Sequence, residues 1–202
     1  MFIHSIFATP VCEQQIPVQS SWLDCLKGLE YAHTGYNWIS KDRNIWLLDE
    51  LSDLKAQIQD AVEHYAYQIL NVVPNIEIDL VRAWSVKHNP GDSAKEHCHT
   101  NAVWSGVYYL NVSPSSGEIC FNKDIMNPNC FLPTLEPDTH TLTEWTSRHW
   151  YFTPVPGSLL IFPSQLKHSV EVNESDDTRY CIGFDVFVRG TMGQDKGSTV
   201  TV

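Results

Sequence analysis

The sequence predicts a mainly β fold with helices near the N-terminus, and three observations point to it. Apolar residues recur at helical spacing up to residue 72, short alternating runs follow residue 75, and turn signals separate those runs. One core can organise a chain of 202 residues, so we expect a single domain over 1–190, with helical support in 18–72 and a β core in 75–190. Short strands preceded by helices indicate a sandwich or barrel, and the pattern favours a barrel buttressed by helices.

Two helices are expected in the first third of the chain. The segment SSWLDCLKGLEYA offers Ser20 or Ser21 as an N-cap, followed by apolar residues at helical steps. A stronger pattern covers 49–72, where one face is apolar and the other is charged or polar. The apolar stripe consists of Leu51, Leu54, Ile58, Val62, Tyr65 and Ile69. We interpret this stripe as core.

The strand-like runs begin with IEIDLVRAWSVKH, which the turn NPGD follows. The later runs are VWSGVYYLNV, GEICFN, HWYFTP, SLLIFP, HSVEV and RYCIGFDVFV. The segment 123–147 is long for a connection, and we expect either a flap over the substrate entrance or a segment whose structure the pattern does not reveal. The small, polar residues 191–202 are expected to form a flexible tail.

Composition and charge exclude several classes of function. The net charge of −11 argues against binding to nucleic-acid phosphates, which needs a surplus of lysine and arginine. No segment has the roughly 18 to 20 apolar residues that cross a bilayer, and the short apolar start lacks the basic residues of a signal peptide. The six cysteines are scattered and form no CxxC pair. We therefore expect reduced thiols and a cytoplasmic protein without membrane contact. The sequence indicates no particular oligomeric state.

A pair of histidines lies in EHCHT, directly before a predicted strand. If this segment is extended, His97 and His99 point the same way and can bind one metal ion. His168, at the start of another predicted strand, is the candidate for a third ligand, and Arg179 follows it by 11 positions. Each residue alone would be an ordinary surface or core residue, so the hypothesis rests on their joint occurrence. We take the neighbouring His88 as structural.

Two blocks around these residues, HCHTNAVWSGVYYL and PGSLLIFPSQLKH, resemble a known enzyme family, as does the lead-in KHNPGDSAKEHCH. They are similar to the oxygenases that use iron(II) and 2-oxoglutarate, in the prolyl-hydroxylase-like branch, within a group from bacteria and their tailed phages. The resemblance covers about 75 to 190. It implies a double-stranded β-helix (a cupin-like jelly roll), Fe(II) and 2-oxoglutarate as cofactors, and ascorbate as an optional reductant.

The resemblance also assigns roles to individual residues. It makes His97 and His168 metal ligands, Arg179 the anchor for the distal carboxylate of 2-oxoglutarate, and Tyr109 its helper. The family normally has a carboxylate where this chain has His99. Three interpretations of His99 stay open: it ligates the metal, it leaves the position to water or a halide, or the metal site is degraded. A third neutral imidazole would leave the site one negative charge short.

We therefore expect a dioxygenase that hydroxylates a small-molecule or peptide substrate and releases succinate and CO2. One alternative is a three-histidine iron dioxygenase that needs no 2-oxoglutarate, against which Arg179 argues. The other is a non-catalytic metal-binding β barrel.

Overall fold

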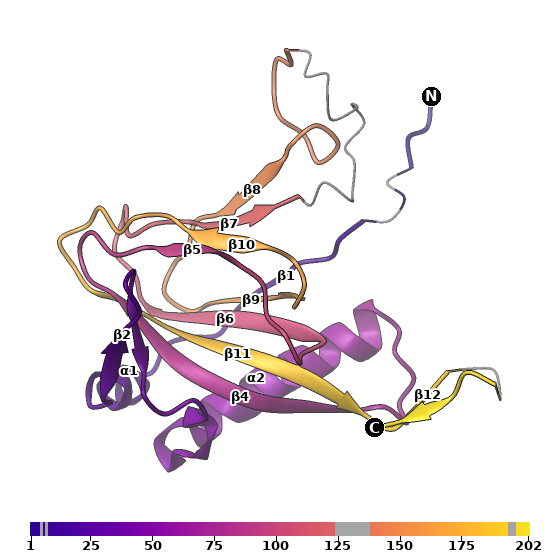
Figure 1. The fold of residues 1–202 in the computed structure, drawn as a ribbon, viewed down its shortest axis with the longest axis horizontal. Helices are drawn as coiled ribbons and strands as arrows, with labels where there is room; N and C mark the ends of the chain where they lie inside the picture. The colour runs from indigo at the N-terminus through magenta and orange to yellow at the C-terminus, as the bar shows by residue number, and fades with distance from the viewer. Residues whose placement is uncertain (5, 7, 124–137, 194–196) are drawn as a thin grey trace.

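A computed structural model of the chain describes residues 1–4, 6, 8–123, 138–193 and 197–202. It is a mainly β fold in which two antiparallel sheets face each other and helices cover the outer face of the larger one (Figure 1). The larger sheet has the strand order β1-β9-β6-β11-β4-β3-β2, and the smaller has the order β5-β10-β7-β8. Most of the 123–147 segment expected to form a flap, residues 124–137, lies outside the described residues.

The larger sheet, which we call the main sheet, consists of β1 (Cys12–Gln15), β2 (Tyr31–His33), β3 (Trp38–Ser40), β4 (Glu77–His88), β6 (Trp104–Asn111), β9 (Ser158–Pro163) and β11 (Arg179–Arg189). The smaller sheet, here the minor sheet, consists of β5 (Ala94–His97), β7 (Ile119–Asn122), β8 (His149–Phe152) and β10 (His168–Val170). In the region expected as a tail, β12 (Thr191–Met192) pairs with β13 (Val200–Thr201).

The helices form where the apolar spacing predicts them, with different ends. The helix α1 (Ser20–Lys27) begins after Gln19, and neither predicted serine acts as N-cap. The second helical region starts as a 3₁₀ turn (Asp49–Leu51), continues as α2 (Ser52–His64) and ends as a π turn (Tyr65–Ile69). A further 3₁₀ turn covers Ile45–Leu47. Among the described residues, no helix is both long and apolar enough to cross a bilayer.

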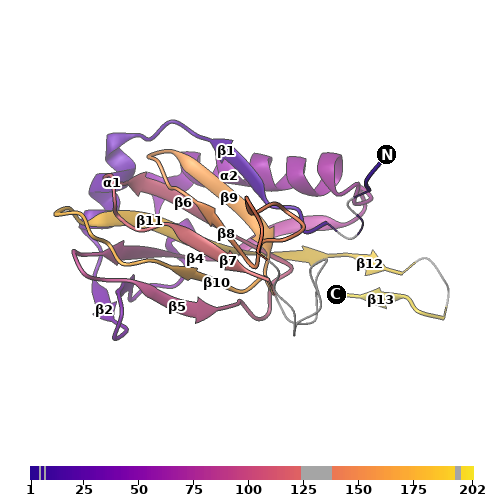
Figure 2. The same ribbon diagram turned by 90° about the horizontal axis from the view of Figure 1, so that it is seen from above.

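The side chains of the main sheet divide between two cores because neighbouring residues of a strand point to opposite faces. On the helix side, Tyr108, Ile182 and Phe184 join the buried residues of α2, which runs along the sheet (Figure 2). The predicted core stripe does not reach its last member, because Ile69 is exposed. On the other side, Tyr109 and Cys181 join Phe121 of the minor sheet. The second core therefore fills the space between the two sheets.

Strand register sets the framework of the site. In the minor sheet, His168 pairs with His97 on one side and with Phe121 on the other. In the main sheet, Arg179 pairs with His88. Directly paired residues point to the same face of an antiparallel sheet, so each pair places its side chains together.

Candidate active site

The structure brings the three predicted histidines together between the sheets. Each offers one ring nitrogen, and these three nitrogens lie within 4.8 Å of one another. The rings of His97 and His99 are stacked, with centroids 5.4 Å apart, and His168 lies 4.4 Å from His97. Within EHCHT, β5 ends at His97, so His99 lies beyond the strand. His99 is instead held from the main sheet, where its backbone N–H donates to the carbonyl of Ser164 at 2.9 Å.

Hydrogen bonds fix which nitrogen of each ring is free. The Nδ1 of His97 lies 2.8 Å from the carbonyl of Lys95, and that of His168 lies 2.9 Å from the carbonyl of Leu166. The Nδ1 of His99 lies 2.6 Å from a carboxylate oxygen of Asp185. A carbonyl or carboxylate can only accept, so each Nδ1 carries the proton and each neutral ring has a lone pair on Nε2. This is the form in which imidazole binds a metal ion.

The surroundings also keep His168 uncharged. Burial, together with the nearby His97 ring, lowers the pKa of His168 to about 3. His97 lies on the more exposed side of the cluster, but the protein atoms around its ring lower its pKa as well. Because metal ligands must be deprotonated, these two rings need no proton release to bind an ion at neutral pH.

Asp185 is the residue that the sequence analysis missed. It lies on β11, its side chain is fully buried, and it accepts hydrogen bonds from His99, Ser105 and Arg82. Burial raises the pKa of this carboxyl, but the hydrogen bonds from His99 and Ser105 and the charge of Arg82 outweigh it, so the pKa lies below its ordinary value. One signal was present in the sequence. Asp185 is the only charged residue in the apolar run YCIGFDVFV, and a carboxylate inside a buried strand needs partners.

Aromatic rings form the walls of the histidine cluster. Phe162 and Phe121 pack against His168, with centroid distances of 4.9 and 5.9 Å. Trp84, on β4, lies 5.5 Å from His99 and passes over Gly183 of the neighbouring strand. A Cβ at Gly183 would come within 2.9 Å of the indole, so this position needs a residue without a side chain.

Arg179, the predicted anchor of 2-oxoglutarate, is the first residue of β11 and is fully buried between the sheets. Its Nη1 donates to the carbonyls of Ser116 and Gly117 at 2.9 and 2.8 Å, and its Nη2 donates to Nδ1 of His88 at 3.0 Å. Among the described residues, its Nε has no hydrogen-bond partner. The guanidinium thus keeps a free edge, made of Nε and one Nη2 hydrogen.

The two tyrosines of VYYLN face opposite sides, as neighbouring residues of a strand do. Tyr108 lies in the core on the helix side and donates to the carbonyl of Ile16 at 3.0 Å. Tyr109 lies between the sheets, with its ring centroid 5.8 Å from the guanidinium carbon of Arg179. The structure therefore places Tyr109, and not Tyr108, beside Arg179.

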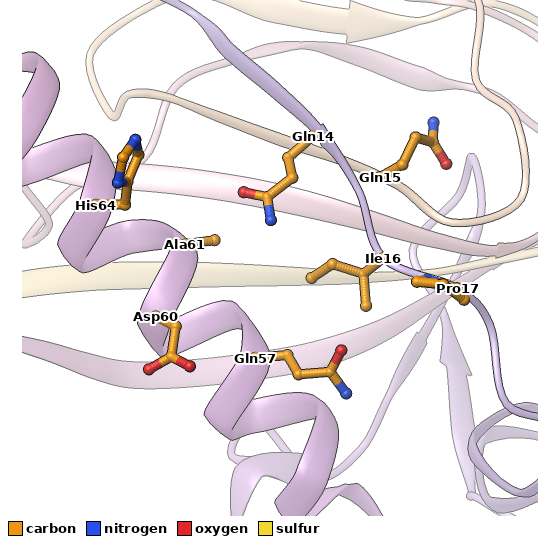
Figure 3. A pocket seen from close by; sticks show the side chains of 8 residues that line it. All are labelled: Gln14, Gln15, Ile16, Pro17, Gln57, Asp60, Ala61 and His64. Atoms are coloured by element: carbon orange, nitrogen blue, oxygen red, sulfur yellow. The ribbon is translucent and has the colours of Figure 1, made fainter.

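A cavity of about 510 Å³ lies elsewhere, between β1 and α2 (Figure 3). Its lining includes Gln14, Gln57, Asp60 and His64 and contains neither the three clustered histidines nor Arg179. It belongs to the helix side of the main sheet, whereas the histidines and Arg179 lie between the sheets.

Structural comparison finds several oxygenases with the same fold. An oxidoreductase of the 2OG-Fe(II) oxygenase family from Burkholderia pseudomallei is 12% identical with a TM-score of 0.57, covering 86% of this chain and 83% of that one. HygX from Streptomyces hygroscopicus, solved with nickel, 2-oxoglutarate and hygromycin B bound, is 12% identical with a TM-score of 0.57, covering 88% and 82%. A Pseudomonas putida prolyl-4-hydroxylase is 14% identical with a TM-score of 0.54, covering 88% and 92%. At these identities the likeness shows a shared jelly-roll fold.

The sequence itself gives the family. A search of the curated proteins found no match. A family model described as "Putative 2OG-Fe(II) oxygenase" matches residues 82–185, which is more than half of the chain and includes all three histidines, Arg179 and Asp185. The chain therefore belongs to this family of 2OG-Fe(II) oxygenases, which use Fe(II) and 2-oxoglutarate as cofactors.

Proposed function

We propose that His97, His99 and His168 ligate Fe(II), that Arg179 binds 2-oxoglutarate, and that the enzyme hydroxylates a small-molecule or peptide substrate with release of succinate and CO2. One observation carries this proposal. All three histidines donate Nδ1–H to a fixed acceptor, and each has one ring nitrogen within 4.8 Å of a ring nitrogen of the other two. Three convergent imidazoles on one side of an ion leave positions open for a chelating co-substrate and dioxygen.

The free edge of Arg179 supports its role as the co-substrate anchor. A planar guanidinium binds a carboxylate through two parallel hydrogen bonds. The Ser116 and Gly117 carbonyls and His88 use the remaining donors, which fixes the plane of the group and leaves Nε and one Nη2 hydrogen together. A buried cation with an unpaired donor is costly unless an acceptor arrives, and the distal carboxylate of 2-oxoglutarate would supply it.

The residues between the histidine cluster and Arg179 exclude water. Tyr109, Phe121, Phe162 and Cys181 form one buried cluster between the sheets, and His168 packs against two of its members. When bound, iron(II) with 2-oxoglutarate supplies the oxidation of a C–H bond by dioxygen, coupled to decarboxylation of the keto acid. A dry wall beside the histidines protects such chemistry from side reactions with solvent. HygX contains a bound small molecule, hygromycin B, which is consistent with a small-molecule substrate here.

Anaerobic titration tests the site. Fe(II) is added to the full chain, followed by 2-oxoglutarate, and a weak visible charge-transfer band is expected only when the keto acid chelates the iron. His168→Ala should lose Fe(II) binding and the band. His64→Ala, on α2, is the matched control and should retain both. Equal binding by the wild type and His168→Ala would refute the proposed metal site.

His99 needs a separate test because a carboxylate normally occupies its position. If His99 is a ligand, His99→Ala should weaken Fe(II) binding at least tenfold, while His99→Asp should retain it. An unchanged affinity in His99→Ala would show that this imidazole does not touch the ion. Succinate release in the presence of Fe(II), ascorbate and 2-oxoglutarate then measures turnover of each variant.

A further inference from the structure

The three-histidine cluster poses a question of charge. Metal sites of this kind usually include a carboxylate, which both holds the ion and offsets part of its charge. Neutral imidazoles do not offset it. Resting on the function proposed above, we propose that Asp185 supplies the missing negative charge from behind His99 and positions that ring as a ligand.

The contact between the two residues is short and shielded from water. Oδ1 of Asp185 lies 2.6 Å from Nδ1 of His99, where the Asp185 side chain is fully buried and that of His99 is 11% exposed. A charge-assisted hydrogen bond in such a place is stronger than one in water. It sets the tautomer of His99, aims Nε2 at the other two histidines, and makes that nitrogen a stronger electron donor to an ion.

The rest of the network holds the carboxylate in one orientation. Oδ1 also accepts from Ser105 Oγ at 2.7 Å, and Ser105 in turn lies 2.9 Å from Ser164 Oγ. Oδ2 accepts from Nε of Arg82 at 2.7 Å, and Nη2 of the same guanidinium lies 2.5 Å from this oxygen. The two oxygens therefore have different partners: Arg82 is bound by one, and the histidine by the other.

Two further features hold Asp185 and His99 in this arrangement. The pairing of β11 with β4 shifts register between Asp185 and Val186, an irregularity of the kind that often redirects a side chain beside a functional site. Arg82 also donates to the carbonyl of Thr100, the residue after His99, at 2.9 Å. The same network thus fixes the ring of His99 through Asp185, and it fixes the backbone next to His99 through the bond from Arg82 to Thr100.

A purely structural ion pair between Arg82 and Asp185 is the competing explanation, and the chain offers a matched control for it. Asp79, on β4, pairs with Arg189 of β11 and touches no histidine of the cluster. Asp185→Asn should weaken Fe(II) binding by 10- to 100-fold in anaerobic calorimetry, the range found for partners of metal-bound histidines. Asp79→Asn should leave the affinity within about twofold, whatever its effect on stability.

A double-mutant cycle separates the role of Asp185 from a general loss of structure. In His99→Asp there is no imidazole for Asp185 to orient, so adding Asp185→Asn should change the Fe(II) affinity by less than about threefold. The same 10- to 100-fold loss in both backgrounds would overturn the proposal. So would an unchanged affinity in Asp185→Asn when His168→Ala abolishes binding, and in that case the proposed metal site itself would stand.

One further test uses the metal-free wild-type chain and therefore does not depend on whether a variant folds. Nitrogen-15 NMR of the histidine rings distinguishes a protonated Nδ1 from a protonated Nε2. The proposal expects His99 to carry its proton on Nδ1, with the strongly deshielded N–H signal of a short bond to a carboxylate. A neutral His99 ring with its only proton on Nε2 would overturn it, because that tautomer can neither donate from Nδ1 to Asp185 nor bind the ion through Nε2.

Discussion

Nη2 of Arg179 donates a hydrogen bond to Nδ1 of His88 at 3.0 Å, across the paired strands β11 and β4. The other ring nitrogen of His88, Nε2, lies 3.4 Å from Nδ2 of Asn37, and the ring also hydrogen-bonds the backbone of Ser93. A histidine that accepts from a permanent cation has to be neutral, since two cations would otherwise share one buried site. His88 therefore helps to orient Arg179, the proposed anchor of the co-substrate.

The first prediction concerns the pH dependence of folding. Burial, reinforced by the charge of Arg179, lowers the pKa of His88 to about 2, whereas an unfolded histidine titrates near 6.5. Below pH 6.5, His88 binds a proton in the unfolded chain but stays neutral in the folded chain, so the free energy of unfolding decreases as the pH falls. Between pH 7 and pH 5 this one group should cost about 2 kcal/mol. Urea unfolding of the wild type should show that extra loss relative to His88→Gln, and equal losses in both proteins would contradict it.

The second prediction separates co-substrate binding from metal binding. Arg179→Lys keeps a positive charge but loses the planar pair of donors. Its dissociation constant for 2-oxoglutarate should rise about 10- to 100-fold, because hydrogen bonds to a charged group are worth roughly 1.5–3 kcal/mol. The affinity for Fe(II) should stay within about threefold. The visible band in anaerobic titration measures the first quantity, and calorimetry measures the second. A parallel loss of both would show that the variant damages the barrel as a whole.

The third prediction uses two adjacent tyrosines as each other's control. Tyr108→Phe removes a buried hydrogen bond to Ile16 on the helix side, so it should cost about 1 kcal/mol of stability and leave 2-oxoglutarate binding unchanged. Tyr109→Phe should weaken 2-oxoglutarate binding several-fold, since Tyr109 lies beside Arg179. Denaturation curves and co-substrate titrations on both variants check this. The reverse assignment of effects would remove Tyr109 from the site.

The fourth prediction tests the wall of the metal site. In Gly183→Ala the new methyl group would meet the indole of Trp84 at 2.9 Å, and Trp84 borders His99. The strain should destabilise the protein by about 1–3 kcal/mol and shift the indole beside His99, which should weaken Fe(II) binding. Gly197→Ala, where no atom of the described residues beyond its chain neighbours lies within 4 Å of the added carbon, is the control. Unchanged stability and metal affinity in Gly183→Ala would mean that Trp84 moves without consequence.

Much of the architecture could be predicted from local patterns. The alternation of IEIDLVRAWSVKH marks β4, and the spacing of the apolar stripe marks α2, because both depend on which face of one element meets the core. The cluster of His97, His99 and His168 could also be predicted, because these histidines lie at the ends of two predicted strands and can meet where those strands come together. The N-cap of α1 was predicted incorrectly, because no side-chain hydrogen bond from a serine caps that helix.

The part of the site that could not be predicted from the sequence consists of contacts between residues far apart in the chain. Asp185 is 86 residues from His99, and His88 is 91 residues from Arg179. Both contacts depend on the register of β11 against its neighbours, including the shift beside Asp185. Nothing in the local sequence sets that register, so a lone aspartate in an apolar strand shows that a partner exists without showing which one.

The two sheets contribute unequally to the histidine cluster, and this has a thermodynamic consequence. His97 and His168 belong to paired strands of the minor sheet, whereas His99 is tied through Asp185 and Ser164 to the main sheet. An ion shared by all three would act as a cross-link that clips one layer of the jelly roll onto the other. Occupancy would then be readable as heat resistance: by mass action, the melting temperature should climb with the logarithm of free iron(II) once the site is saturated. The most sensitive reporter would be hydrogen exchange in β5 and β10, the strands that carry His97 and His168.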